Sequence, residues 1–511
     1  MNVHNNTPSS ASVWKLWCAA WILAGCETGL DFDAHAGLNW ALSTLALSAL
    51  FVSLLLAAGK APRWQRLLPL GFACAIGAGA ALTTNAGLDA LIVIGVAGSL
   101  AAASLLASDG AAPHSLGATA LLLGPATATV SALQEAARRV GELARRYRQG
   151  RNLAALRGVA LATPITLGLA LLLSNAEPIM AAWRDEITRV LQEFSFLGRL
   201  TFFLFAGVMA LGYLGQALRP AVGPNPVTPL REDRERQRLV ETERLIVLVS
   251  VVSLFALFFV LQLSHLIGTA AGTRGSGVTY AQTVHEGFAE MTLAASFCVV
   301  LTLGLLHSAG GKGLSTREKR LGVLLTIQSQ MLLLSALYRI DRYEEVYGYT
   351  ELRLLVQCYE ICVLIGLSLL AVELLWGPDF KRYARRCIVT GLSMLIVLLY
   401  WNYAAWIAHE NLTRYASSGR LDVRYLVQGL GGDAVPELTR SLPALPPSVQ
   451  RRLRSCLQSR YSPPPDRPSA HAAWYEWRYR QSQMEQALAL AGLAATPQIA
   501  ARPDPAFDPC A

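Results

Sequence analysis

Long hydrophobic runs alternate with short polar stretches along most of this 511-residue chain. An α-helix needs about 20 apolar residues to cross the hydrocarbon core of a bilayer. Runs close to that length cover 13–30, 36–58, 67–84, 86–106, 158–174, 196–217, 245–267, 287–307, 321–337, 354–376 and 387–407. The pattern predicts an all-α fold, a polytopic transmembrane helix bundle of about 11 spans with a small helical extramembrane domain at the C-terminus.

One further apolar stretch, 115–133, carries Gly124 and Pro125 at its middle. The loops at 60–66 and 134–157 are rich in arginine or lysine, and such loops stay in the cytoplasm. Two crossings between them place both on that side, whereas three do not. We therefore predict that 115–133 is a re-entrant or interfacial segment, that the N-terminus is cytoplasmic and that the C-terminus is periplasmic or extracellular.

The first apolar run contains LAGC at 23–26, which looks like the box of a lipoprotein signal peptide. A chain with many spans follows, so an uncleaved first span is favoured over lipidation of Cys26.

Composition changes the picture in two ways. Charged residues make up 15% of the chain, against about 25% in soluble domains, which supports a membrane protein. The net charge of +9 comes from loops beside the spans, so it indicates orientation in the lipid bilayer rather than nucleic-acid binding. The nine cysteines form no CxxC pair, and neither a metal nor another cofactor is predicted.

Changes in composition divide the chain into five parts. They are an N-terminal membrane half (1–218), a linker with a charged amphipathic helix (219–244), a C-terminal membrane half (245–408), an extracytoplasmic helical domain (409–496) and a disordered tail (497–511). Within the domain, Asp422 and Asp433 are predicted helix N-caps. Cys456 and Cys510 could pair if this part lies outside the cytoplasm. The aromatic segment 474–480 is predicted to dock the last helix onto its own domain or the membrane surface.

The polar stretch 338–353, YRIDRYEEVYGYTELR, separates two spans and is predicted to be an outer loop with a tight turn at Gly348. Ionisable and polar residues gather at this end of the second half. The candidates for a ligand-binding or structural polar cluster are His285, Glu286, Glu290, Arg339, Asp341, Glu345, Arg353, Glu360, Asn402 and His409.

Glu360 should lie about two turns inside the hydrocarbon, where an acid indicates a functional site by default. The structural alternative is that Arg353 or another arginine neutralises Glu360 and Glu290 and so specifies helix packing. The spacing of the histidines and carboxylates does not favour zinc. Phosphate loops, HExxH, GxSxG and dinucleotide fingerprints are absent from the sequence.

Several segments resemble a known family: FFVLQLSHLIG (258–268), VTYAQTVHEGFAEM (278–291), ALYRIDRYEEVYGYTELRL (336–354), NYAAWIAHENLTRY (402–415), and LDVRYL with GDAVPEL (421–438). They are similar to an uncharacterised family of bacterial multi-pass inner-membrane proteins known as a domain of unknown function. The family pattern YGxTxxR is matched here by YGYTELR, in which Gly348, Thr350 and Arg353 keep the glycine, threonine and arginine positions. The resemblance covers roughly 240–493 and implies a bacterial cytoplasmic-membrane protein, without an activity, cofactor or catalytic residue.

Three functions are compatible with the sequence. The first is a non-enzymatic scaffold, sensor or regulator whose helical domain contacts a protein partner outside the cytoplasm. The alternatives are a transporter or lipid flippase with an outward-facing polar cavity, and a membrane-embedded transferase. Closed ion pairs around Glu290, Arg353 and Glu360 would favour the scaffold, a hydrated cavity the transporter, and a lipid-lined groove the enzyme.

Overall fold

The computed structural model describes residues 10–31, 34–57, 64–108, 195–217, 244–256, 288–309, 314–377, 379–461, 473–493 and 510. These residues form helices and connecting turns and contain no strand, which confirms the all-α prediction for this part of the chain. They belong to two compact units. The N-terminal unit comprises 1–225 and 471–479, and the C-terminal unit comprises 226–470 and 480–511.

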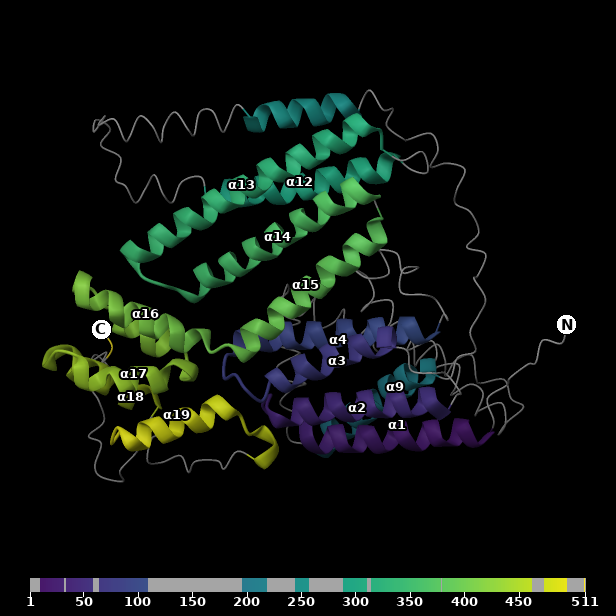
Figure 1. Cartoon of the computed structure of the whole chain (residues 1–511). Helices are drawn as coiled ribbons and strands as arrows, with labels where there is room; N and C mark the ends of the chain where they lie inside the picture. The colour runs from purple at the N-terminus through teal and green to yellow at the C-terminus, as the bar shows by residue number, and fades with distance from the viewer. Residues whose placement is uncertain are drawn as a thin grey trace, which may run out of the picture. The chain divides into compact units, whose positions relative to one another are not determined.

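The N-terminal unit is a helical bundle (Figure 1). Its described helices are α1 (Ser10–Asp31), α2 (Leu38–Ala57), α3 (Trp64–Gly79), α4 (Ala86–Ser108) and α9 (Ser195–Ala217). Neighbours in the bundle include α1 with α9 and α3 with α4. Leu16, Phe51 and Leu211 are buried at its core, and the ring of Phe51 stacks on Tyr213 with centroids 4.8 Å apart.

A short segment near the C-terminus, 473–479, is bound to the turns of this bundle. The amide of Leu38 donates to the carbonyl of Trp477 over 3.1 Å, and that of Tyr479 donates to the carbonyl of Ala81 over 2.7 Å. Arg478 donates to the carbonyl of Ala36. The α1–α2 and α3–α4 turns therefore lie at the same end of the unit. Within the predicted docking segment 474–480, residues 477–479 thus bind the N-terminal helices, while Arg480 bonds to Asp433 of its own domain.

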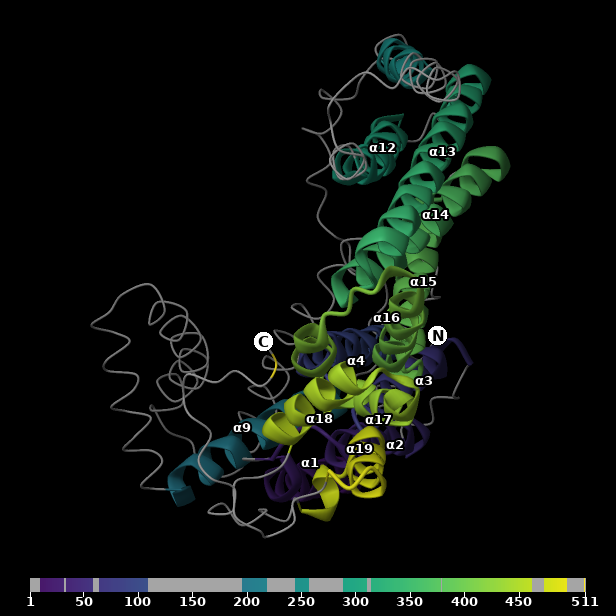
Figure 2. The same cartoon turned by 90° about the vertical axis from the view of Figure 1, so that its left-hand side faces the viewer.

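The C-terminal unit contains a second group of long helices. They are a helix at Arg244–Ala256, α12 (Phe288–Ala309), α13 (Thr316–Tyr347), α14 (Glu351–Trp376) and α15 (Phe380–Tyr400). Figures 1 and 2 show α13 and α14 side by side, with α12 next to α13. Ser315 and Glu318 cap the start of α13 in a capping box, and Arg244 pairs with Glu318 over 2.7 Å.

The same unit ends in shorter helices, α16 (Tyr403–Ser418), α17 (Val435–Ser441), α18 (Pro447–Tyr461) and α19 (Tyr479–Leu490), of which α19 begins at the last residue assigned to the N-terminal unit. We call the described residues 403–461 and 480–493 the helical domain. Arg480 pairs with Asp433 over 3.0 Å, with both side chains almost fully buried. Cys456 and Cys510 form a disulfide with their Cα atoms 4.9 Å apart.

The apolar helices make this a membrane-embedded protein. Six described helices are long and apolar enough to cross a bilayer: 38–57, 86–104, 198–215, 316–347, 351–376 and 381–400. Shorter apolar helices cover 67–79, 244–256 and 295–304. The predicted segments 115–133 and 158–174 lie outside the described residues, so the predicted number of about 11 spans stays a prediction.

Two predicted boundaries are wrong. The stretch 338–347 is not a loop, because α13 continues to Tyr347 and keeps Leu333, Ala336, Ile340 and Glu344 buried along one face. At about 1.5 Å per residue, its 32 residues span about 48 Å, so its polar end extends beyond a hydrocarbon core of about 30 Å.

The predicted span 387–407 also ends differently. The helix α15 stops at Tyr400, and the side chain of Asn402 accepts from the amide of Ala405 at the start of α16. Asp433 is not a helix N-cap, since its carboxylate accepts from Arg480 instead. Asp422 does cap a helical turn by accepting from the amide of Tyr425 over 2.9 Å.

Candidate functional site

The turn between α13 and α14 consists of Gly348, Tyr349 and Thr350. Gly348 has φ 90° and ψ 164°, a conformation that only glycine adopts readily. A Cβ on Gly348 would lie 2.5 Å from Oδ1 of Asn411 on α16. The prediction of a tight turn at this glycine is confirmed, and the close approach of α16 is a second reason for glycine here.

Asn411 binds the turn through both ends of its side chain. Its Oδ1 accepts from the amide of Tyr349 over 3.1 Å, and its Nδ2 donates to the carbonyl of Tyr349 over 2.9 Å. Arg414, one turn further along α16, donates to the carbonyl of Val346 over 2.9 Å. The ring of Trp406 meets that of Tyr349 edge-on at 5.3 Å. These contacts fix α16 against the turn.

Glu351, the first residue of α14, makes the next connection. Its Oε1 accepts from the hydroxyl of Tyr403 over 2.9 Å, and its amide donates to the hydroxyl of Tyr425 over 2.7 Å. Burial raises the pKa of Tyr425. We call the contacts of Tyr349 and Glu351 with Tyr403, Asn411 and Tyr425 the turn clamp.

The predicted site residues on α13 and α14 have varied surroundings. Arg353 donates to the carbonyl of Gly348, and its guanidinium carbon lies 4.5 Å from the ring centre of Tyr343. Arg353 also interacts electrostatically with the carboxylate of Glu344 on α13, whereas no bond joins it to Glu360 among the described residues. Glu345 forms an exposed pair with Arg342 over 2.7 Å. Elsewhere on α13, Arg339 is half-buried and Asp341 is exposed.

The predicted site residues at the start of α16 and within it contact other residues of the helical domain. Asn402 donates from its Nδ2 to the carbonyl of Asp433 over 3.0 Å. His409 lies 3.0 Å from Glu437 through its Nδ1 and is mostly exposed. Asn402, Trp406 and His409 therefore do not form the end of a span, because α16 is a separate helix that follows α15.

Three candidates from the segment before and at the start of α12 are not tested by this geometry. His285 and Glu286 lie outside the described residues. Glu290 lies in the first turn of α12, and its side chain is outside the described part. Among the described residues, no group of three or more His, Cys, Asp or Glu side chains is arranged to hold a metal ion.

Glu344 is a member of this end of the bundle that the predicted site left out. Its side chain is 2% exposed, and its Oε2 accepts from Nε2 of Gln357 over 2.8 Å. Reading 338–347 as a helix would have placed Glu344 on the buried face, four residues after Ile340.

Glu360 lies further along α14 and is 0% exposed. Its Oε1 is 2.5 Å from the hydroxyl of Thr292 on α12, while its Oε2 has no hydrogen-bond partner among the described residues. The structure thus confirms a buried acid inside a predicted span and pairs it with a hydroxyl rather than with an arginine.

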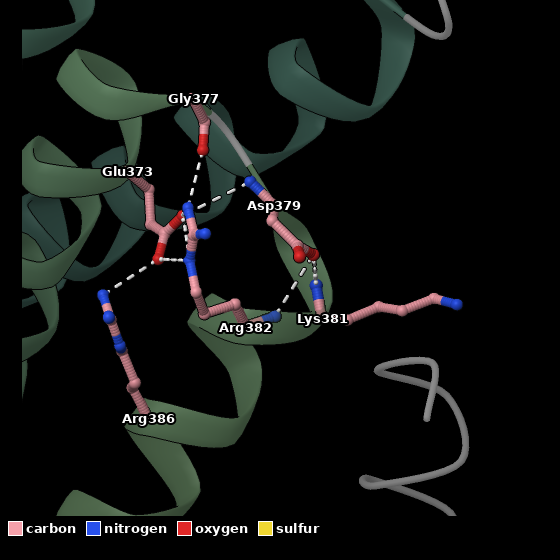
Figure 3. A network of polar contacts seen from close by, with 6 residues as sticks. All are labelled: Glu373, Gly377, Asp379, Lys381, Arg382 and Arg386. Carbon is pink, nitrogen blue, oxygen red and sulfur yellow. Dashed lines mark hydrogen bonds and ion pairs between the residues drawn. The ribbon is translucent and has the colours of Figure 1, made fainter. Parts of the chain in front are cut away.

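A second buried acid on α14 was missed by the sequence reasoning (Figure 3). Glu373 is 1% exposed and binds Arg382 of α15 through both carboxylate oxygens, with Nε at 2.7 and 3.0 Å. Arg386 donates to its Oε1 over 3.0 Å, and the amide of Asp379 to its Oε2 over 3.3 Å. Two arginines at the start of α15 therefore neutralise this buried carboxylate.

The surroundings of the acids show what this arrangement can do chemically. Glu344 and Glu351 at the α13–α14 end, and Glu373 at the other end of α14, each accept hydrogen bonds from protein donors. Among the described residues, Oε2 of Glu360 is buried without a hydrogen-bond partner.

Comparison with known proteins identifies a protein family that this chain matches. No curated protein and no solved structure matches this chain. A family model described as "Domain of unknown function (DUF4153)" matches residues 70–441. The match begins earlier than the predicted 240, ends before α18, and includes α13, α14, α16 and the turn clamp. Since it covers more than half of the chain, this membrane protein belongs to the family described as Domain of unknown function (DUF4153).

Proposed function

We propose that this protein is a non-enzymatic scaffold, sensor or regulator of the bacterial cytoplasmic membrane. Its helical domain contacts a protein partner outside the cytoplasm. The observation that carries this proposal is the turn clamp. Asn411 binds Tyr349 in the turn between α13 and α14, and Tyr403 and Tyr425 bind Glu351 at the start of α14. These hydrogen bonds attach the helical domain to the ends of two long apolar helices.

The state of the buried acids supports the same conclusion. A substrate site needs donors and acceptors that a ligand can use, whereas the carboxylates of Glu344, Glu373 and Asp433 are already bound by protein side chains. Bonds of this kind specify helix packing. They support a structural role for these three carboxylates.

The proposed orientation has the N-terminus in the cytoplasm and the helical domain outside. Two observations support it. The disulfide between Cys456 and Cys510 is suited to an oxidising compartment. The segment 473–479 binds the α1–α2 and α3–α4 turns, which the positive-inside count also places outside.

Reporter fusions to the full chain test this orientation. Alkaline phosphatase, which folds only where its disulfides form, is expected to be active when joined after Ala511 and inactive when inserted at 310–313. Green fluorescent protein should show the opposite pattern. An active phosphatase at 310–313 with an inactive one at the C-terminus would overturn the orientation and the outside location of the partner.

Charge-neutralising variants test the non-enzymatic role. In a strain that depends on this protein for a measurable phenotype, Glu344→Gln and Glu351→Gln are expected to complement the deletion, because glutamine still accepts the bonds from Gln357 and Tyr403. Loss of complementation by both variants at normal protein levels would refute the scaffold and favour chemistry or transport by these acids.

Photocrosslinking tests the partner. A photoreactive amino acid at Leu490, which is 91% exposed on α19, is expected to give a discrete protein adduct in cells. The same amino acid at Leu375, 60% exposed on the apolar helix α14, is the matched control and should give none. Equal adducts at both positions, or none at Leu490 and at other exposed sites of the domain, would speak against a docking role.

A second candidate function, a transporter, is favoured by one observation. Glu360 is a buried acid inside an apolar helix, and one of its oxygens is unbound. Intramembrane acids of this kind occur along ion and proton pathways.

A further inference from the structure

Glu360 and Glu373 lie on the same helix, α14, and are equally buried at 0% and 1% exposure. Their surroundings are opposite. Glu373 faces two arginines and a backbone amide, which together saturate its carboxylate (Figure 3). Glu360 has one hydroxyl, that of Thr292, on one oxygen and nothing on the other.

Several described residues of the same three helices are apolar or neutral. Ala295 of α12, Leu333 of α13 and Leu367 of α14 form a buried hydrophobic cluster in the same three-helix region. Beside Glu360 on α14, the hydroxyl of Tyr359 lies 2.9 Å from that of Ser296. Within the part of the chain that the structure describes, no arginine, lysine or histidine is bonded to Glu360.

A carboxylate ion in such a place would have one hydrogen bond and no counter-charge. Transfer of a lone ion out of water is so unfavourable that buried acids become neutral instead. A neutral carboxylic acid requires fewer hydrogen bonds than a carboxylate ion. Its hydroxyl takes part in one hydrogen bond, and its carbonyl oxygen tolerates the lack of a partner far better than a charged oxygen does.

We propose that Glu360 is a proton-binding site inside the membrane bundle. The residue is a neutral carboxylic acid at neutral pH, whereas Glu373 is ionised. The proton lies in the short bond of 2.5 Å between Oε1 of Glu360 and the hydroxyl of Thr292. The ligand class is therefore the proton itself, at the contact between α12 and α14.

Polar groups lie along α14 on both sides of Glu360. Gln357 lies one turn before Glu360, and its side-chain amide donates to Glu344, which is buried near the α13–α14 turn. Towards the other end, Ser368 accepts from Gln330 over 2.8 Å, and the next acid of α14 is Glu373, already bound by Arg382 and Arg386.

Infrared difference spectroscopy on the full chain in lipid tests the proposal. The spectrum of the wild type minus that of Glu360→Gln is expected to show the carbonyl stretch of a protonated carboxylic acid. Wild type minus Glu373→Gln is the matched control and should show carboxylate stretches instead. A carboxylate band for Glu360 would overturn the proposal, since the residue must contribute one band or the other.

A second measurement does not depend on the folding of either variant. Dicyclohexylcarbodiimide is an apolar reagent that adds to a protonated acid. The acid proton moves to a carbodiimide nitrogen, and the carboxylate oxygen joins the central carbon. The acyl group then shifts to nitrogen to give a stable N-acylurea, and nothing is released. Mass spectrometry of wild type is expected to find this adduct on Glu360 and not on Glu373. An adduct on Glu373 with none on Glu360 would contradict the assignment.

The thermal stability of the neutral variant Glu360→Gln provides a third test. Glu360→Gln is expected to leave the midpoint of thermal unfolding within about 2 °C of wild type, because glutamine is uncharged and can still bond to Thr292. A large fall in the midpoint together with a carboxylate band in the wild type would assign Glu360 to an ionised structural role instead.

Discussion

Replacing Gly348 by alanine is the sharpest perturbation of the turn clamp. Alanine at φ 90° and ψ 164° is strained by roughly 1–3 kcal/mol. The new Cβ would also lie 2.5 Å from Oδ1 of Asn411, so that the amide has to move away from Tyr349. Loss of the two bonds between Asn411 and Tyr349 adds about 1 kcal/mol each. The free energy of unfolding of the C-terminal unit should fall by roughly 3–5 kcal/mol.

Thermal unfolding of the purified full chain measures this effect, and Gly391→Ala provides the control. Gly391 lies within α15, and a Cβ there meets nothing within 4 Å, so its replacement should leave the midpoint unchanged or slightly higher. Gly348→Ala should lower the midpoint by on the order of 10 °C. Asn411→Ala, which removes the bonds without the backbone strain, should lie between the two. Equal midpoints for Gly348→Ala and Gly391→Ala would refute the role assigned to the clamp.

Three further changes have expected sizes. Glu373→Gln leaves two partly exposed arginines without their carboxylate and should cost about 1–3 kcal/mol of stability, whereas the exposed Glu345→Gln should cost less than about 0.5 kcal/mol, both measured by thermal unfolding. Cys456→Ser removes a link across a sequence separation of 54 residues, and should lower the stability of the helical domain by up to about 4 kcal/mol, an effect that a reducing agent should reproduce in wild type. Arg480→Ala leaves Asp433 buried without its partner and should cost about 3–5 kcal/mol, seen as increased protease sensitivity of the helical domain.

The hydrophobic pattern predicted the class of fold well, because a bilayer demands long apolar helices whatever their function. It failed at the polar ends of those helices. The stretch 338–347 was interpreted as a loop from its charges, but α13 is long enough to leave the hydrocarbon and continue as a helix. A polar sequence beyond a span can be helical as easily as a loop, and only the buried stripe that includes Ile340 and Glu344 indicates which.

The partners of polar residues were the least predictable part of the site. Gly348 could be assigned to a turn from its residue type alone. Nothing in the sequence near it indicates that Asn411, 63 residues later, binds that turn. Arg353, expected to reach a carboxylate, interacts electrostatically with Glu344 and also bonds to the carbonyl of Gly348, because the turn brings this acceptor back over the first turn of α14. Such long-range and backbone contacts depend on how the chain folds back on itself.

The two buried glutamates of α14 show why an acid within a span needs its surroundings before it can be interpreted. Glu373 lies near the end of the helix, where Arg382 and Arg386 reach it from the start of α15 while their other atoms remain partly exposed. Its charge is therefore neutralised by the first turns of the next helix. Glu360 lies too far from either end for such help, and Thr292 supplies a hydroxyl but no charge. The rule that an intramembrane acid marks a functional site thus applies to Glu360 for a physical reason, since a proton is what balances its charge there.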